Sequence, residues 1–150
     1  MSKIKSNKAL ITGGASGIGK LMGLQLLQKG LSTLVIWDIN ETLLQSTALE
    51  FKKMGYEVYI YLVDVMNTTQ VINTAALVKK EVGKIDILIN NAGIAHVGNI
   101  EAVEEPDLDR LYEVNIKGVY NCTKACIPHM KKGGGSILNL ASIASSVGIF

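Results

Sequence analysis

The sequence predicts a doubly wound α/β fold, in which helices cover both faces of a parallel β-sheet. Short apolar segments alternate regularly with segments of helical pattern, and the first apolar segment runs directly into a glycine-rich turn. The chain is 48% hydrophobic with a mean hydropathy of +0.28, which suits strands that are buried on both faces. We expect its 150 residues to form one domain, spanning residues 1–150.

The first part of the chain contains four expected strands. The first strand is Lys8 to Thr12, and it leads through the glycine turn into a helix that ends near Lys29, before Gly30. Asn67 and Thr68 are candidate N-caps of a later helix. The other strands are expected over residues 33–38, 57–63 and 85–89, with helices over 41–54 and 67–82. This alternation implies a parallel sheet with right-handed crossovers.

The last part of the chain is expected to hold one long helix and a fifth strand. Acidic residues at 101–105 precede Pro106, which suits the first turn of a helix. The helical pattern continues to about Lys132, and three glycines then end it. Residues 136–141 form the fifth expected strand.

The glycine turn after the first strand is typical of a binding site for the pyrophosphate of a dinucleotide. Gly13, Gly17 and Gly19 stand between a strand and a helix, in the spacing T-G-x-x-x-G-x-G. Glycines let the backbone approach the phosphates, and the N–H groups and dipole of the helix start favour an anion there. A glycine-rich turn without any ligand is the alternative.

Asp38 ends the second expected strand, 19 residues after Gly19. A carboxylate there can accept hydrogen bonds from the adenosine ribose and repel a 2′-phosphate, which favours NAD over NADP. The alternative is an aspartate that only caps a turn.

These features, with Asn90-Asn91-Ala92-Gly93 after the fourth strand and with Asn115 and Ser142 further on, resemble the short-chain dehydrogenase/reductase family. The resemblance spans nearly the whole chain. It implies a Rossmann fold with strand order 3-2-1-4-5, continuing beyond this chain.

The resemblance also implies which residues hold the cofactor. The glycine turn would bind the pyrophosphate, Asp64 and Val65 would border the adenine ring, and the Asn-Ala-Gly element would line the cleft. For Asp64, the alternative is an ordinary turn residue after a strand. The complete expected set is Thr12, Gly13, Ser16, Gly17, Ile18, Gly19, Asp38, Asp64, Val65, Asn91, Ala92 and Gly93.

For catalysis, the resemblance implies that the Ser142 hydroxyl binds the substrate oxygen and that Asn115 holds a water in a proton relay. The family's Tyr-x-x-x-Lys pair is expected about a dozen residues after Ser142, beyond Phe150. Tyr120 and Lys124 have the same spacing but precede Ser142, and we interpret them as unrelated to catalysis.

The implied activity is hydride transfer between NAD(H) and a secondary alcohol or carbonyl compound, such as a steroid, a retinoid or another lipid-like alcohol. The 150 residues alone are then expected to be inactive. The alternative is a non-catalytic nucleotide-binding fragment or sensor that lacks the Tyr/Lys pair. Resemblance also predicts a homodimer or homotetramer.

Composition argues against several other classes of protein. The net charge is +2 and the charges are scattered, so we expect no nucleic-acid partner. No apolar segment is long enough to span a bilayer, and the polar start of the chain does not resemble a signal peptide, which predicts a cytoplasmic location. Cys122, Cys126 and His129 share a helical face, but without a fourth ligand we expect core packing and no metal site.

Overall fold

The computed structural model describes residues 4–96, 98–130 and 133–143. Its five strands are β1 (Lys8–Thr12), β2 (Thr33–Asp38), β3 (Val58–Leu62), β4 (Ile87–Asn90) and β5 (Ser136–Asn139). Its α-helices are α1 (Gly17–Gln28), α2 (Glu41–Lys53), α3 (Thr68–Glu81), α4 (Glu105–Tyr112) and α5 (Gly118–Met130). A short 3₁₀ helix covers Ile100–Ala102.

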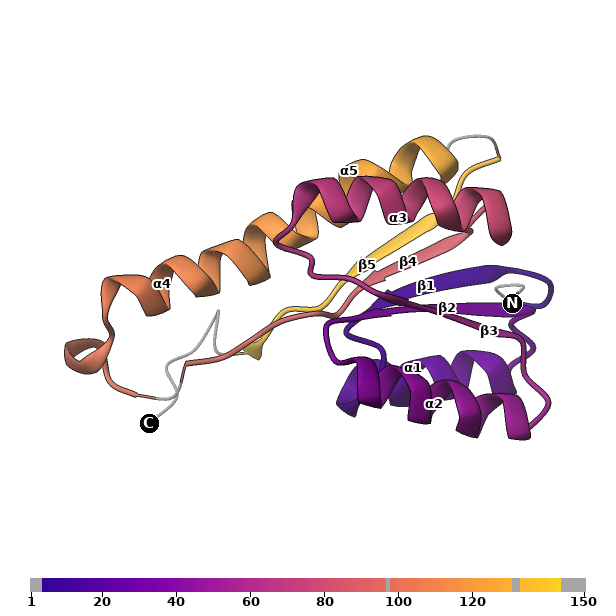
Figure 1. Cartoon of the computed structure of the whole chain (residues 1–150), viewed down its shortest axis with the longest axis horizontal. Coiled ribbons are helices and arrows are strands. Elements are labelled where there is room, and N and C mark those ends of the chain that lie inside the picture. Colours follow the sequence, from indigo (N-terminus) through magenta and orange to yellow (C-terminus); the bar gives the residue numbers. More distant parts are fainter. Residues whose placement is uncertain (1–3, 97, 131–132, 144–150) are drawn as a thin grey trace.

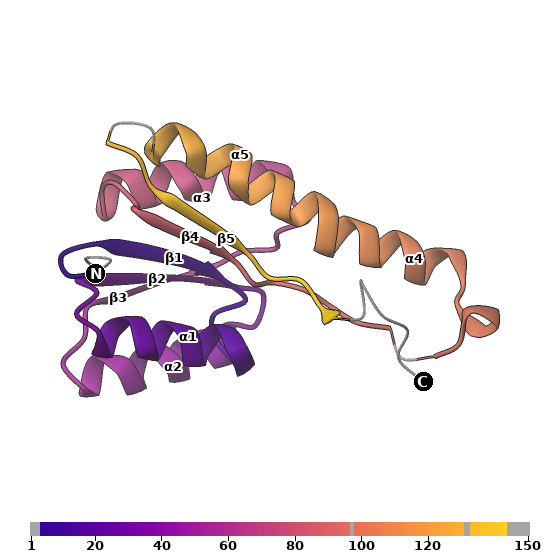
Figure 2. The same ribbon diagram turned by 180° about the vertical axis from the view of Figure 1, so that it is seen from behind.

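All strand pairs are parallel, and the sheet has the order β3-β2-β1-β4-β5. This confirms the predicted fold class and the 3-2-1-4-5 order. Helices α1 and α2 lie on one face of the sheet, and α3 and α5 lie on the other (Figure 1). Figure 2 shows the same two helical layers from behind, with β5 along the edge of the sheet opposite β3.

Alternation along the strands divides the core between the two layers. Ala9 and Ile11 of β1 belong to the apolar cluster on the α1 and α2 side, whereas Leu10 belongs to the cluster packed with α3 and α5. Successive side chains of a strand point to opposite faces, so a strand buried on both sides must be apolar throughout. This explains the continuous apolar segments in the sequence.

The expected helix boundaries agree closely with the structure in the first part of the chain. Asn40 and Asn67 cap α2 and α3, each accepting a hydrogen bond at its side-chain oxygen from a backbone N–H three residues later. Such caps satisfy N–H groups that have no partner within the helix. They begin both helices within one residue of the predicted positions.

The long helix differs from the prediction because it is not one regular α-helix. A five-residue π-helical segment, Glu113–Lys117, separates α4 from α5, and the three segments form one continuous rod (Figure 1). The predicted end near Lys132 lies outside the described residues. Within the described parts of the chain, none of the helices combines the length and apolar character that crossing a membrane requires.

Candidate cofactor site

A cavity of about 410 Å³ lies where the strands end, between the start of α1 and the rod of α4 and α5. Its walls come from the loops that follow β1, β2, β3 and β4, at the end of the sheet toward which the β5 arrow points (Figure 1). Ten of the twelve predicted cofactor residues line it: Gly13, Ser16, Gly17, Ile18, Asp38, Asp64, Val65, Asn91, Ala92 and Gly93. The volume is in the range of small-molecule sites.

The glycine turn leaves an open approach to the backbone at Gly17. Its φ is +52°, and a Cβ atom built there would have no atom within 4 Å. Gly13 also has a positive φ, +63°, but a Cβ there would lie 2.9 Å from the Cα atom of Ala92. Gly17 therefore borders free space in the cavity, whereas Gly13 allows two loops to pack together.

The start of α1 is suited to an anion. Ser16 is the N-cap residue, yet within the described chain its side chain makes no capping hydrogen bond. The first N–H groups of an α-helix have no partner inside the helix and carry its positive partial charge. A phosphate group at Gly17 would meet these donors.

Thr12 and Gly19 do not line the cavity but support the turn from behind. The Thr12 hydroxyl accepts hydrogen bonds from the backbone N–H groups of Asn91 and Ala92, both at 3.1 Å. The Asn91 side-chain amide donates to the carbonyl oxygens of Thr12 and Gly13 at 3.1 and 2.9 Å. A Cβ on Gly19 would lie 2.3 Å from the Gly13 carbonyl oxygen, so only glycine fits there.

The Asp38 carboxylate lines the cavity and also ties two loops together. One oxygen accepts from the backbone N–H of Ala15 and the other from that of Asn40, each at 3.0 Å. The turn-capping alternative thus describes part of its role. Each carboxylate oxygen can accept a second hydrogen bond, so the group remains able to bind a ribose hydroxyl.

Asp64 and Val65 lie side by side in the loop after β3 and line the same cavity. Asp64 accepts a hydrogen bond from the Met66 backbone N–H at 2.9 Å, and its own backbone N–H donates to the Gln70 side chain at 2.9 Å. These bonds hold the loop after β3 against the start of α3.

Asn115 lies in the π-helical segment and pairs with the backbone of Ile94. Its side-chain oxygen accepts from the Ile94 N–H and its side-chain NH₂ donates to the Ile94 carbonyl, both at 2.9 Å. Ile94 lines the cavity and Asn115 does not. The side chain therefore positions the loop after β4, and the predicted water-holding role stays a prediction.

Ser142 is exposed three residues after β5 ends, and it is not among the residues that line the cavity. Its predicted role toward the substrate stays a prediction. The Tyr120 and Lys124 side chains are hydrogen-bonded to each other at 2.8 Å, but they line a different cavity, next to β5. The pair thus lies away from the candidate cofactor cavity, and our interpretation that it is unrelated to catalysis stays a prediction.

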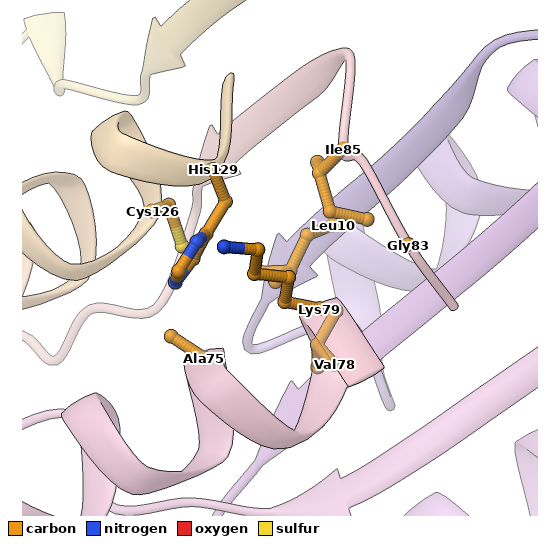
Figure 3. Close-up of a pocket in the computed structure, with 8 residues that line it drawn as sticks. All are labelled: Leu10, Ala75, Val78, Lys79, Gly83, Ile85, Cys126 and His129. Carbon is orange, nitrogen blue, oxygen red and sulfur yellow. The ribbon is translucent and has the colours of Figure 1, made fainter. Parts of the chain in front are cut away.

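A small cavity of about 10 Å³ lies between α3, α5 and the sheet, and it has room for about one water. Figure 3 shows the side chains of Lys79 and His129 pointing toward each other beside Cys126. Burial, with the Lys79 charge, lowers the pKa of His129, and burial raises the pKa of Cys122 and Cys126 to about 12. In the described residues, no three His, Cys, Asp or Glu side chains converge as metal ligands.

Seven further residues line the cavity but were not in the predicted set: Trp37, Ile39, Val63, Met66, Ile94, Arg110 and Val114. Five of them lie at or just after strand ends, next to predicted residues, so their position in the sequence could have identified them. Arg110 and Val114 come from the helical rod, far along the chain from the glycine turn. Only the tertiary fold brings them to the cavity.

Comparison with known proteins gives consistent matches. A family model described as short chain dehydrogenase matches residues 7–150. Human estradiol 17-beta-dehydrogenase 11 is 38% identical over 141 residues, which cover 93% of this chain and 47% of that protein. Human 17-beta-hydroxysteroid dehydrogenase 13 is 36% identical over 141 residues, with the same coverage of 93% and 47%. The chain spans about half the length of the curated relatives it matches.

Solved structures match over nearly the whole chain. An NAD⁺-bound xylitol dehydrogenase has a TM-score of 0.92 and 29% identity, and the match covers 99% of this chain and 57% of that one. A gluconate 5-dehydrogenase from Burkholderia cenocepacia, in complex with NADP and tartrate, has a TM-score of 0.90 and 35% identity, with coverage of 97% and 57%.

Proposed function

Because this chain belongs to the short-chain dehydrogenase family, we propose that its cavity binds a nicotinamide dinucleotide, and that the complete protein transfers a hydride between this cofactor and a secondary alcohol or carbonyl compound. The observation that carries the proposal is the open approach at Gly17, beside an uncapped helix start. The bound nicotinamide would supply the hydride chemistry. The residues of this chain would bind and orient it.

We assign the parts of the cofactor to walls of the cavity. The pyrophosphate would lie on the glycine turn at Gly17, and the adenosine ribose would bind the Asp38 carboxylate. The adenine ring would lie against Val65, with its exocyclic amine toward Asp64. Gly93 and Ile94, in the loop after β4, would border the nicotinamide half.

Asp38 supports a preference for NAD over NADP. Its carboxylate lines the cavity at the end of β2, and a 2′-phosphate placed near it would meet a like charge. Arg110 is the single basic side chain among the described residues that line the cavity, and it comes from α4 rather than from the β2 loop. The loop that holds Asp38 thus offers a phosphate no positive partner.

For the substrate, we propose a steroid or another lipid-like alcohol. The relatives of highest similarity reported above carry the names estradiol 17-beta-dehydrogenase and 17-beta-hydroxysteroid dehydrogenase. In the complete protein, Ser142 would bind the reacting oxygen of the substrate, together with the Tyr/Lys pair expected beyond Phe150. The homo-oligomer and the cytoplasmic location stay predictions.

A nucleotide-binding protein without catalysis is the second candidate. It is favoured by one observation: no tyrosine lines the cofactor cavity among the described residues, and Tyr120 lies at another cavity. Under this alternative, dinucleotide binding would persist without turnover.

Binding is testable with the chain itself. Trp37 is the single tryptophan, is fully buried and lines the cavity, so excitation energy should be transferred from Trp37 to bound NADH. We expect saturable NADH emission on excitation of Trp37, and its absence at millimolar NADH would contradict the proposal. Turnover of NAD⁺ by the complete protein with a panel of hydroxysteroids and other secondary alcohols would then separate the enzyme from the non-catalytic alternative.

A further inference from the structure

Arg110 is the single arginine of a chain whose Lys and Arg residues number 15. It is also the single basic side chain that lines the cofactor cavity within the described residues. Arginine carries a planar group with five donors that matches phosphate in a bidentate manner, which lysine cannot do. Arg110 is exposed, and its position at this cavity suits an anionic ligand group.

Neither of the acidic residues one helical turn from Arg110, Asp107 and Glu113, pairs with it. Asp107, three residues before it, lies 3.7 Å from His96, and Glu113, three residues after it, binds Lys117 at 2.7 and 2.9 Å. Across the described parts of the chain, the guanidinium itself has no ion pair and no side-chain hydrogen bond. Arg110 is thus left with its donors free.

The helical rod carries Arg110 to the wall of the cofactor cavity. Gly118 packs so closely on Val65 that a Cβ atom would lie 2.7 Å from a methyl group of that valine. Val114, four residues earlier, lines the cavity, and Arg110 lines it four residues earlier again. Gly17 and Ile18 at the start of α1 and Arg110 of α4 line the same cavity, and α4 lies beyond the end of the sheet (Figure 1).

We propose that Arg110 is a cofactor-binding residue that holds the pyrophosphate from the α4 wall, opposite the helix start at Gly17. This inference rests on the proposed dinucleotide site and adds a residue to it. The two carboxylates of Asp38 and Asp64 line the same cavity. A pyrophosphate in a cavity that already holds these two carboxylates needs a compensating positive charge, and the Arg110 guanidinium would supply it at the pyrophosphate, away from the ribose hydroxyls that Asp38 would bind.

The test compares Arg110→Gln with the unmodified chain for three ligands: NADH, ADP and adenosine. NADH binding is followed by energy transfer from Trp37, and ADP and adenosine by displacement of bound NADH. Arg110→Gln should weaken NADH and ADP about tenfold or more, the effect of losing a charge-assisted hydrogen bond, and leave adenosine unchanged. The NADH and ADP affinities of Arg110→Lys should lie between those of the unmodified chain and of Arg110→Gln, because lysine keeps the positive charge but loses the bidentate guanidinium.

Lys124→Gln is the matched control, since it removes one positive charge from the same rod at a side chain that lines the other cavity. It should leave all three affinities unchanged. Wild-type affinity of Arg110→Gln for ADP would overturn the inference alone, as would an equal loss for adenosine, which would place the guanidinium on the adenine ring. Failure of the unmodified chain to bind NADH would overturn the proposed function, and this inference with it.

Discussion

Glycines that look equivalent in the sequence have different physical roles in the turn after β1. Gly17 borders open space, so a ligand can approach its backbone, whereas Gly19 is enclosed by the Gly13 carbonyl and the Asn91 side chain. The spacing predicted that all of them matter. The neighbours of each glycine, from the turn itself and from Asn91 after β4, decide which glycine can serve a ligand and which serves packing.

Alanine at these two glycines should therefore give different results. Gly17→Ala should cost about 1–2 kcal/mol of stability from its positive φ, because no atom obstructs the methyl group, while NADH binding is lost at the phosphate approach. Gly19→Ala should destabilise more, since its methyl would collide with backbone. Urea unfolding and NADH titration of both variants check this, and a Gly17→Ala protein that binds NADH normally would remove Gly17 from the proposed site.

Asp38 gives a second prediction at a single residue. Asp38→Asn keeps the size of the side chain but removes its charge, and we expect the preference for NADH over NADPH to fall roughly tenfold. Some stability should also be lost, because only one of the bonds to Ala15 and Asn40 can still be accepted by an amide oxygen. Parallel titrations with both cofactors measure the ratio, and an unchanged ratio contradicts the assignment.

Among the elements, the helical rod departs most from the prediction. Its π-helical segment holds Asn115 against Ile94 and is followed by the close contact of Gly118 with Val65. Local sequence favours a helix throughout this stretch, and the interruption depends on partners from the loops after β3 and β4. π-helical segments of this kind are often found at functional sites.

Asn115→Ala tests this positioning role. Two hydrogen bonds to the Ile94 backbone disappear, so we expect a loss of about 1–3 kcal/mol of stability and weaker NADH binding, with faster amide exchange at Ile94. A role confined to holding a catalytic water would leave both stability and NADH affinity unchanged. Urea unfolding, NADH titration and hydrogen exchange together distinguish the two.

Asp86 joins three strands at their starts and gives a pH-dependent prediction. Its carboxylate accepts from the Lys8 N–H at 3.0 Å and pairs with Lys84 at 2.9 Å, while its backbone carbonyl accepts from Ser136. Burial alone would raise its pKa, but the bonds from Lys84 and Lys8 outweigh this and the pKa is lowered from 3.8.

A lowered folded-state pKa means that the ionised form stabilises the fold above the ordinary pKa of 3.8, and that this stability is lost as the pH falls through the lower folded value. Asp86→Asn should therefore be less stable than wild type by a constant amount between pH 7 and pH 5. The difference should shrink below about pH 4. Urea unfolding at several pH values measures it, and a difference that does not change with pH would assign the effect to something other than the charge.

In the molecule as a whole, β5 forms one edge of the sheet. The β5 edge exposes apolar side chains, with Ile137 at 41% and Leu138 at 48%. Apolar cavities border β5 on both faces, one lined by α1 residues with Leu138 and one by α5 residues with Asn139. An exposed apolar edge strand is a template for association with another chain.

We therefore expect the 150-residue chain to associate as its concentration rises. Leu138→Lys should shift sedimentation toward the monomer, because a charge on an edge strand opposes pairing. Leu77→Lys is a matched control on an exposed apolar residue of α3, and it should not change the association. Equal association of wild type and Leu138→Lys would show that the β5 edge is not the contact.

The fold class, the glycine turn and most of the cavity's lining could be predicted from the sequence, and the strand order from its resemblance to a family. These follow from local periodicity and from residues next to strand ends, and parallel strands bring such residues to one edge of the sheet. The tertiary structure was needed to show that Thr12 and Gly19 support the turn rather than line the cavity, that Asn115 binds Ile94, and that Arg110 lines the cavity. Each of these depends on contacts between segments distant along the chain, and local patterns do not encode such contacts.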